Sequence, residues 1–376
     1  MTKRLLVVSP LVDGWQPVPR ASWYMHGGRR IRDIAEGILS AQVTVEHLDW
    51  MPGPEFADAL DARLSEADAL VMSPWLGFND QLRFDGARLD RATNLKAIAG
   101  TFDFRLSWID LDEAARRGVT LIDTSRTMTP TVAEFGVAVT FALLRDIPAA
   151  IQTVRAGGWT KAPMGADSFV FRDLADCRVG LAGYGSINRH YRRFVRPYGC
   201  EVTTFDPFVT DEELARDAVG RADSMVDLAR GCDILIVAIP PTPTTLGVIS
   251  AEVIDALAPG SLFVLLSRMA VVDQDALWRR VEAGELRAAV DVYDPEPPPG
   301  DAWFRGAANV LPTPHIAGNV PFAHERCLAE ACADAVRVVN GDAPRHAVTL
   351  RDKATYEGTP TSAPAGRAAA RRAAGP

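Results

Sequence analysis

Three polar residues whose side chains can bind an anion or move a proton lie at or just beyond the ends of predicted buried strands. Arg268 follows the apolar run FVLLS, Glu296 follows AAVDVYDP, and His315 follows NVLPTP. An arginine presents fixed donors that match a planar carboxylate. A histidine exchanges a proton with a hydroxyl near neutral pH, and a carboxylate bonded to its other nitrogen fixes the tautomer. Together these residue types suit acid–base chemistry on an anionic substrate.

Each of these residues, taken alone, also has an ordinary structural explanation. Arg268 could form a structural ion pair, Glu296 could be a solvated acid in a proline-rich loop, and His315 could be a satisfied histidine in a turn. Their joint position after a nucleotide-binding pattern favours the chemical interpretation.

That pattern occupies residues 178–206. An apolar run that suits a buried strand precedes a glycine turn, helix-like residues and a second apolar strand that ends in an acid. Glycines allow a tight turn and a close approach to a pyrophosphate, whose charge meets the N–H groups at a helix N-terminus. Gly183, Gly185 and Asn188 fill the positions of G-x-G-x-x-G, and the acid is Asp206.

Asp206 favours NAD over NADP as the cofactor. It would accept hydrogen bonds from the adenosine ribose hydroxyls, whereas a 2′-phosphate would meet a like charge. The glycine pattern alone also fits a plain tight turn, but the preceding strand and the acid about 20 residues later favour the cofactor site. Asn188 replaces the third glycine, so the packing of helix on strand is expected to open slightly there.

Alternating strands and helices along the chain predict an α/β fold with parallel sheets covered on both faces. Strands are expected at 5–8, 42–48, 69–72, 95–99, 120–122, 179–182, 200–205, 234–239, 261–266, 288–290 and 310–311. Helices are expected at 29–39, 58–66, 111–117, 131–144, 211–216, 275–283 and 322–340, with a pairing segment at 226–228. Ligands bind at the carboxyl ends of such strands, so the loops at Ser9, Trp75 and 101–107 are candidate substrate contacts.

Composition narrows the class of protein. The 376 residues are enough for two domains, and the net charge of −8 indicates no nucleic-acid surface. Five cysteines without a C-x-x-C pair argue against a disulfide framework or a zinc site, and no metal is expected. Without a signal peptide or an uninterrupted apolar span, the chain is predicted to be soluble and cytoplasmic, with no membrane contact.

The motifs in order resemble those of the D-isomer-specific 2-hydroxyacid dehydrogenases, with a phosphoglycerate dehydrogenase-like pattern. They are GYGSIN and FDP, SR at 267–268, VVDQDAL at 271–277, DVYDPEP at 291–297 and TPHIAG at 313–318, preceded by LKAIAG at 95–100, IDLDEAARRGVTLIDT at 109–124 and TVAEF at 131–135. The resemblance covers roughly residues 70–340.

The resemblance implies a Rossmann-type NAD domain, residues 129–317, inserted in a discontinuous flavodoxin-like substrate domain. The substrate domain would comprise 1–128 and 318–350, and the chain would cross between domains in the helices after Thr129 and Gly318. Family members usually form homodimers through the NAD domain. Residues 351–376, rich in Pro, Ala, Gly and Arg, are expected to be a disordered tail, with a partner-binding basic tail as the alternative.

The resemblance also implies an NAD-dependent interconversion of a 2-oxo acid and a D-2-hydroxy acid. Arg268 would hold the substrate carboxylate and carbonyl oxygen, His315 would be the acid and base, and Glu296 would be its partner. The presence of Glu296 argues against the formate dehydrogenase branch. Asp291 would bind the nicotinamide carboxamide, and the other expected cofactor contacts are Gly183, Gly185, Ser186, Ile187, Asp206 and Pro240.

Two further departures from the family concern the substrate. Met269 follows Arg268 where glycine is usual, which would place a large side chain near the site. The loop TFDFRLSW at 101–108 replaces a glycine-rich turn that normally holds the substrate carboxylate. Arg105 could meet a second anionic group, so we expect a larger or doubly charged substrate. The expected substrate contacts are Trp75, Thr101, Phe102, Arg105 and Arg268.

Two alternatives stay open from the sequence. A non-catalytic NAD-binding sensor or corepressor could use the same fold, because a fold does not fix a function. A different hydride acceptor, such as an aldehyde or a phosphonate, is the weaker alternative. The sequence does not choose between glyoxylate, hydroxypyruvate, phosphoglycerate and a specialised metabolite.

Overall fold

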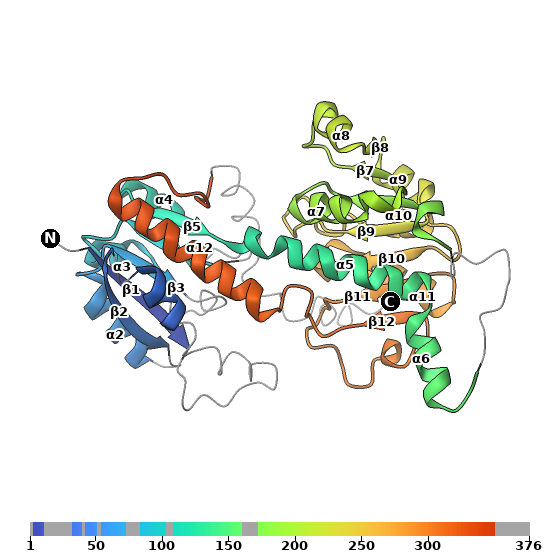
Figure 1. Ribbon diagram of the computed structural model, residues 1–376, viewed down its shortest axis with the longest axis horizontal. Coiled ribbons are helices and arrows are strands. Elements are labelled where there is room, and N and C mark those ends of the chain that lie inside the picture. The colour runs from blue at the N-terminus through green and yellow to red at the C-terminus, as the bar shows by residue number, and fades with distance from the viewer. Residues whose placement is uncertain are drawn as a thin grey trace, which may run out of the picture. The chain divides into compact units, whose positions relative to one another are not determined.

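The structure, a computed structural model, describes residues 3–10, 32–39, 42–50, 54–72, 83–102, 108–159 and 172–349 (Figure 1). The expected tail from residue 351 lies outside these residues. The chain divides into two compact units, one from Met1–Met128 with the segment that begins at Asn319, and one from Thr129–Gly318. Each unit has its own parallel sheet and its own core.

The sheet of the first unit has five parallel strands in the order β2-β1-β3-β4-β5, a flavodoxin-like order. They are β1 Arg4–Pro10, β2 Thr44–Trp50, β3 Ala69–Met72, β4 Ala97–Gly100 and β5 Thr120–Asp123. The helical segments are 32–39, α2 Pro54–Leu64, α3 Gly86–Arg91, α4 Leu111–Arg116, the 3₁₀ turn η3 Ser125–Met128 and α12 Pro321–Asn340.

Both faces of this first sheet are covered. Successive residues of a strand point to opposite faces, and in β1 Leu5 and Val7 join one buried cluster while Leu6 and Val8 join another. The long helix α12 packs against β3, β4 and β5, although it follows the second unit in the sequence (Figure 1). The first unit is therefore built from both ends of the described chain.

The sheet of the second unit has seven parallel strands in the order β12-β11-β10-β9-β6-β7-β8. They are β6 Arg178–Ala182, β7 Glu201–Phe205, β8 Gly220–Arg221, β9 Ile234–Val237, β10 Leu262–Leu265, β11 Arg287–Val290 and β12 Val310–Pro312. The order reverses direction at β6 and β9, as in Rossmann folds, and ligands of such sheets bind at that switch point.

Helices cover both faces of the second sheet. They are α5 Thr129–Leu144, α6 Ile147–Arg155, α7 Ser186–Val195, α8 Asp211–Asp217, α9 Met225–Gly231, α10 Ala251–Asp255 and α11 Gln274–Glu282, with 3₁₀ turns η4 Leu174–Asp176, η5 Arg196–Tyr198, η6 Met269–Val271 and η7 Trp303–Arg305. The side chains of Thr210, Ser224, Ser250 and Asp273 cap α8, α9, α10 and α11, which satisfies N–H groups that a helix leaves free at its start.

The stretch Ser125–Leu144 is the one helical segment among the described residues that could cross a membrane by length and composition. Core helices of soluble proteins pass the same test. Its main part, α5, packs against α7, β10 and β11 within the second unit, and seven of its residues are buried.

The predicted fold class is confirmed: both sheets are parallel and a Rossmann-type unit interrupts a flavodoxin-like one. Four helices, α3, α6, α9 and α10, were not expected. The segment 226–228, expected to pair with a strand, lies instead within α9, whose start Ser224 caps by accepting a hydrogen bond from the Asp227 N–H.

Candidate active site

The order of strands in the second sheet brings three predicted site residues to one edge. Strands β10, β11 and β12 are neighbours and parallel, so their carboxyl ends lie together. Arg268 follows β10, Glu296 follows β11 and His315 follows β12. The predicted trio therefore comes from three adjacent loops of the same unit.

His315 and Glu296 form a short hydrogen bond. Nδ1 of His315 lies 2.6 Å from Oε1 of Glu296, and the two side chains are 27% and 26% exposed. An ionised carboxylate can only accept, so Nδ1 carries the proton in this pair. This leaves Nε2 as the nitrogen that can exchange a proton with another molecule.

The electrostatic environment of Glu296 keeps it ionised. Partial burial acts to raise the pKa of Glu296, but the hydrogen bond and charge of His315 oppose it. A hydrogen bond from the backbone of Tyr293 and the charge of Arg268 act in the same direction as His315, and the net pKa is lowered. The charge of Arg268, the third member of the trio, thus helps to keep this carboxylate ionised.

His315 has a backbone conformation that is uncommon for residues other than glycine. Its φ is +54°, in the left-handed region. Such conformations cost on the order of 1 kcal/mol or more in residues other than glycine, and they cluster at functional sites. The surrounding contacts must therefore hold this loop in place.

Asp291 supplies those contacts. Its buried carboxylate accepts three hydrogen bonds from the loop that carries His315. Oδ1 accepts from the Thr313 hydroxyl at 2.6 Å and the Ile316 N–H at 2.8 Å, and Oδ2 accepts from the Ala317 N–H at 2.8 Å. Asp291 was expected to contact the nicotinamide. In the structure its carboxylate holds the loop that carries His315.

Arg268 is half-buried, and its neighbour Met269 is not where the sequence suggested. Nη1 of Arg268 donates to the carbonyl of Ser267 at 2.7 Å, which fixes one end of the guanidinium. The side chain of Met269 is 3% exposed and packs in the apolar core of the second unit. The expectation that Met269 places a flexible side chain at the site is therefore wrong.

The glycine turn after β6 has the geometry that a pyrophosphate requires. Gly183 has φ +78°, and a Cβ there would lie 3.1 Å from Ile239. A Cβ built on Gly185 meets no atom within 4 Å among the described residues, so the space above it is open. Gly185 directly precedes α7, whose first N–H groups have no partner within the helix. These residues fit the cofactor.

Asp206 directly follows β7, beside this turn. Its Oδ2 accepts from the Tyr184 N–H at 2.7 Å and its Oδ1 from the Phe208 N–H at 2.8 Å. Each oxygen keeps a further lone pair for a ribose hydroxyl.

The remaining predicted cofactor residues lie around this turn and the next strand. Ser186 shares a 2.8 Å hydrogen bond with Thr129, and Ile187 packs against the core. Pro240 follows β9, and its carbonyl accepts from the Thr245 hydroxyl at 2.6 Å.

Asn188 does something that the usual glycine cannot do. Its Nδ2 donates to the carbonyls of Ala182 at 3.2 Å and Gly183 at 2.7 Å, so it ties α7 to the turn. The residue is fully buried, and Oδ1 has no hydrogen-bond partner among the described residues. Instead of only opening the packing, the asparagine fills the space with an amide.

The predicted substrate contacts of the first unit are less complete. Trp75 and Arg105 lie outside the described residues. Thr101 is buried, and its hydroxyl lies 3.1 Å from that of Thr124. Phe102 is fully buried against Trp108, with ring centroids 5.1 Å apart, and its N–H donates to Asp123. Phe102 therefore offers no exposed side chain to a substrate, contrary to expectation.

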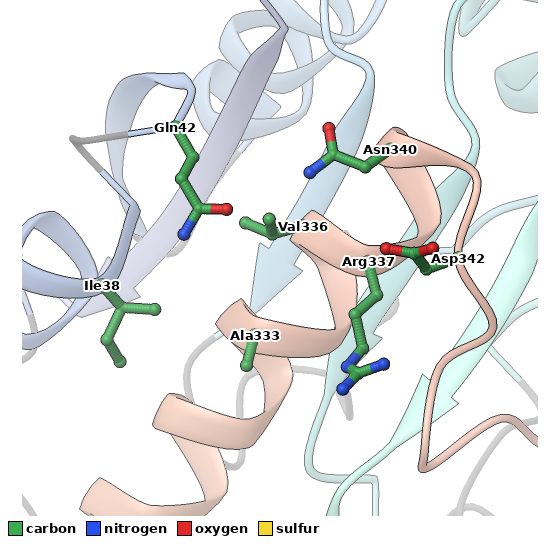
Figure 2. Close-up of a pocket in the computed structure, with 7 residues that line it drawn as sticks. All are labelled: Ile38, Gln42, Ala333, Val336, Arg337, Asn340 and Asp342. Carbon is green, nitrogen blue, oxygen red and sulfur yellow. The ribbon is translucent and has the colours of Figure 1, made fainter.

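A shallow groove of about 270 Å³ opens in the first unit (Figure 2). Figure 2 shows the amides of Gln42 and Asn340 above an apolar floor, with Arg337 and Asp342 at the side. The lining residues are Ile38, Gln42, Ala333, Val336, Arg337, Asn340 and Asp342. None of them is a predicted site residue, and the groove belongs to the C-terminal end of α12.

Sequence reasoning missed the residues that hold the site loops. The Thr313 hydroxyl donates to Asp291 and holds the loop of His315, and Arg305 donates to the loop of Glu296. Tyr184 donates to Asp206 through its N–H and to Asp217 through its hydroxyl. The proline run at 297–299 was one available signal, since prolines cannot donate backbone hydrogen bonds and leave carbonyls that need a donor.

Comparison with known proteins adds a family match. Residues 137–317 match the model described as D-isomer specific 2-hydroxyacid dehydrogenase, NAD binding domain. A D-3-phosphoglycerate dehydrogenase of Mycobacterium bovis is 30% identical over 301 residues, which are 80% of this chain and 53% of that protein. The chain thus spans about half the length of such relatives. An (S)-sulfolactate dehydrogenase of Chromohalobacter salexigens is 29% identical over 71% of this chain and 86% of its own.

Solved structures show the same fold. The apo form of D-mandelate dehydrogenase from Rhodotorula graminis superposes with a TM-score of 0.73 at 19% identity, covering 93% of this chain and 98% of that one. A phosphoglycerate oxidoreductase from Rhizobium etli gives a TM-score of 0.72 at 24% identity, over 92% of this chain and 98% of its own.

Proposed function

We propose that the chain, whose residues 137–317 match the NAD-binding domain of the D-isomer-specific 2-hydroxyacid dehydrogenases, uses NAD to interconvert a 2-oxo acid and a D-2-hydroxy acid. The observation that carries the proposal is the 2.6 Å hydrogen bond between His315 and Glu296, beside Arg268. A protein that only senses NAD would not need a histidine with one nitrogen committed to a carboxylate and the other free to exchange a proton.

Each residue of the trio has a task in the reduction of a 2-oxo acid. Bound NADH supplies the hydride. Arg268 binds the substrate carboxylate and stabilises the negative charge that develops on the carbonyl oxygen. Protonated His315 gives a proton to that oxygen from Nε2 and becomes neutral, and before this transfer the Glu296 carboxylate stabilises the positive ring through Nδ1. In the oxidation, neutral His315 takes the hydroxyl proton back.

Cofactor preference is proposed to depend on Asp206. Its carboxylate lies at the end of β7, where the adenosine ribose of a dinucleotide binds in Rossmann folds. A 2′-phosphate would meet this negative charge, so we propose that NADH is used in preference to NADPH.

The substrate is proposed to carry a second anionic group. Two relatives are named for phosphoglycerate and sulfolactate, acids with an additional phosphate or sulfonate. Arg105, in the loop that departs from the family pattern, is the proposed contact for that group. If Arg105→Ala leaves the kcat/KM ratio between dianionic and monoanionic 2-oxo acids unchanged, the substrate proposal is wrong.

The first unit is proposed to bind the substrate.

The protein is further proposed to act as a cytoplasmic homodimer. One face of α6 is apolar and exposed, which leaves it available to a second copy: its residues Ile147, Ile151 and Val154 are 42–57% exposed. The five cysteines are all free, as suits a reducing compartment. Sedimentation analysis of Ile151→Glu would test the dimer, with a monomer as the expected result.

The test of function is NADH oxidation against a panel of 2-oxo acids that differ in size and charge. His315→Ala is expected to reduce turnover by at least about 100-fold, since general acid catalysis contributes that much or more. His346→Gln is the control, because His346 also pairs with a glutamate, Glu330 at 3.5 Å. NADH binding by fluorescence with no turnover on any acid would instead favour the sensor.

A further inference from the structure

The loop that carries Glu296 has few backbone donors of its own, although the Tyr293 N–H donates to the Glu296 carboxylate and the Ala302 N–H donates to the Pro299 carbonyl at 3.2 Å. Prolines at 295, 297, 298 and 299 surround the glutamate and have no N–H to donate. Further donors are therefore needed to fix the remaining carbonyls of this backbone. The position of the Glu296 side chain, and hence its bond to His315, depends in part on those donors.

Arg305 is such a donor. Its Nε donates to the carbonyl of Pro299 at 2.8 Å, and its Nη2 donates to the carbonyl of Pro298 at 2.8 Å. The two carbonyls belong to consecutive residues that begin two positions after Glu296. A planar guanidinium spans such a pair with two parallel bonds, which an ammonium group cannot reproduce.

The base of Arg305 is itself anchored in the core. The preceding residue, Phe304, is buried and its ring lies between those of Trp278 and Tyr293, with centroids 4.7 and 5.6 Å away. The Tyr293 hydroxyl donates to the carbonyl of Val290, the last residue of β11, at 2.8 Å. The aromatic stack thus fixes η7 on the sheet, and Arg305 extends from this fixed turn to the proline loop.

We propose that Arg305 is a positioning residue for the acid–base pair: its guanidinium holds the proline loop so that Glu296 meets Nδ1 of His315. The proposal rests on the proposed acid–base role of that pair. A purely structural Arg305 would affect only the stability of the protein. A positioning Arg305 also changes how readily His315 takes up a proton, because the carboxylate stabilises the protonated ring.

The test is an NMR titration of the histidine ring protons in the full-length, cofactor-free protein, with His315→Gln used to assign the signal. Glu296→Gln sets the scale and is expected to lower the titration midpoint of His315 by about 1 pH unit or more, since it removes an adjacent opposite charge. Arg305→Ala is expected to lower the midpoint by roughly half of that shift. Arg279→Ala is the matched control, an exposed arginine that pairs with Asp255 and should leave the midpoint unchanged.

Arg305→Lys separates the effect of the two parallel N–H donors from the effect of the positive charge. It keeps the positive charge and loses the paired donors, so its midpoint should fall between those of the wild type and Arg305→Ala. Thermal unfolding of each variant checks that it is folded, and the lysine variant serves if the alanine variant is not. A midpoint in both Arg305 variants within about 0.1 pH unit of the wild type would overturn the proposal.

The outcomes also separate this proposal from the proposed function. The titration requires no substrate and no turnover, so a protein that reduces no 2-oxo acid can still show the Arg305 effect. If Glu296→Gln itself leaves the midpoint unchanged, the pair is not coupled and Arg305 cannot act through it, which overturns the positioning role. Failure of the function alone would appear as absent turnover with the titration shifts intact.

Discussion

Replacement of Asp291 by asparagine tests whether one buried carboxylate holds the His315 loop. The carboxylate is 2% exposed and accepts from Thr313, Ile316 and Ala317 at 2.6–2.8 Å. Asparagine keeps the shape but turns one of the two oxygens into an NH₂ group. If the amide oxygen takes the place of Oδ1, the NH₂ group faces the Ala317 N–H, and two donors then oppose each other.

The free-energy change can be estimated from these contacts. The Ala317 N–H is buried and would lose its partner, which costs about 1–3 kcal/mol. The two bonds from Thr313 and Ile316 would change from charge-assisted to neutral, a loss of roughly 1 kcal/mol each. We therefore expect Asp291→Asn to destabilise the loop by about 3–5 kcal/mol.

Native-state hydrogen exchange, supported by urea unfolding, measures this effect. A local loss of 3 kcal/mol corresponds to an acceleration of roughly 100-fold for the amides of Ile316 and Ala317. Thr313→Val is the control, because it removes only the hydroxyl donor and should cost about 1 kcal/mol. If Asp291→Asn weakens NAD binding but leaves both amides as protected as in the wild type, Asp291 contacts the nicotinamide and does not hold the His315 loop.

Two further predictions concern buried side chains, one in each unit. Burial lowers the pKa of His324 to about 4, from 6.5 in the unfolded chain. Between these two values the unfolded state binds more protons than the folded state, so the free energy of unfolding decreases as the pH falls from 6.5 to about 4. At pH 5 this loss amounts to about 2 kcal/mol relative to pH 7.5, and it should be absent from urea unfolding of His324→Gln. Asn188→Gly restores the usual third glycine but removes the two hydrogen bonds to Ala182 and Gly183. We expect it to lower the free energy of unfolding by roughly 1–3 kcal/mol, and an unchanged or raised melting temperature would contradict that role.

Most of the fold could be predicted because the strands of two parallel sheets are buried on both faces. Such strands appear in the sequence as short apolar runs, as at Ile234–Val237 and Leu262–Leu265, where every residue is buried. Two of the elements that were missed, β8 and α6, have no buried residue. Strand β8 has only two residues, both exposed.

The meeting of Arg268, Glu296 and His315 at one sheet edge also follows from the order of parallel strands. The direction of individual side chains does not. Phe102 points into the core because Gly100 leaves room for its ring, where a Cβ would lie 2.7 Å from it. Met269 also points inward, where it packs in the apolar core of the second unit. The local pattern of residue types does not predict the direction of either side chain.

The two loops that meet at His315 and Glu296 need opposite kinds of support, and the second unit supplies both. The 313–317 loop has N–H groups to satisfy, and the acceptor is the carboxylate of Asp291. The proline loop has carbonyls to satisfy, and the guanidinium of Arg305 donates to two of them, beside the Ala302 N–H that donates to Pro299. The strained backbone of His315, with φ +54°, lies between two of the groups that Asp291 holds, so these bonds offset a local cost of about 1 kcal/mol or more. The short histidine–carboxylate bond is therefore a consequence of supports outside the pair, and a variant that weakens either support should lengthen it.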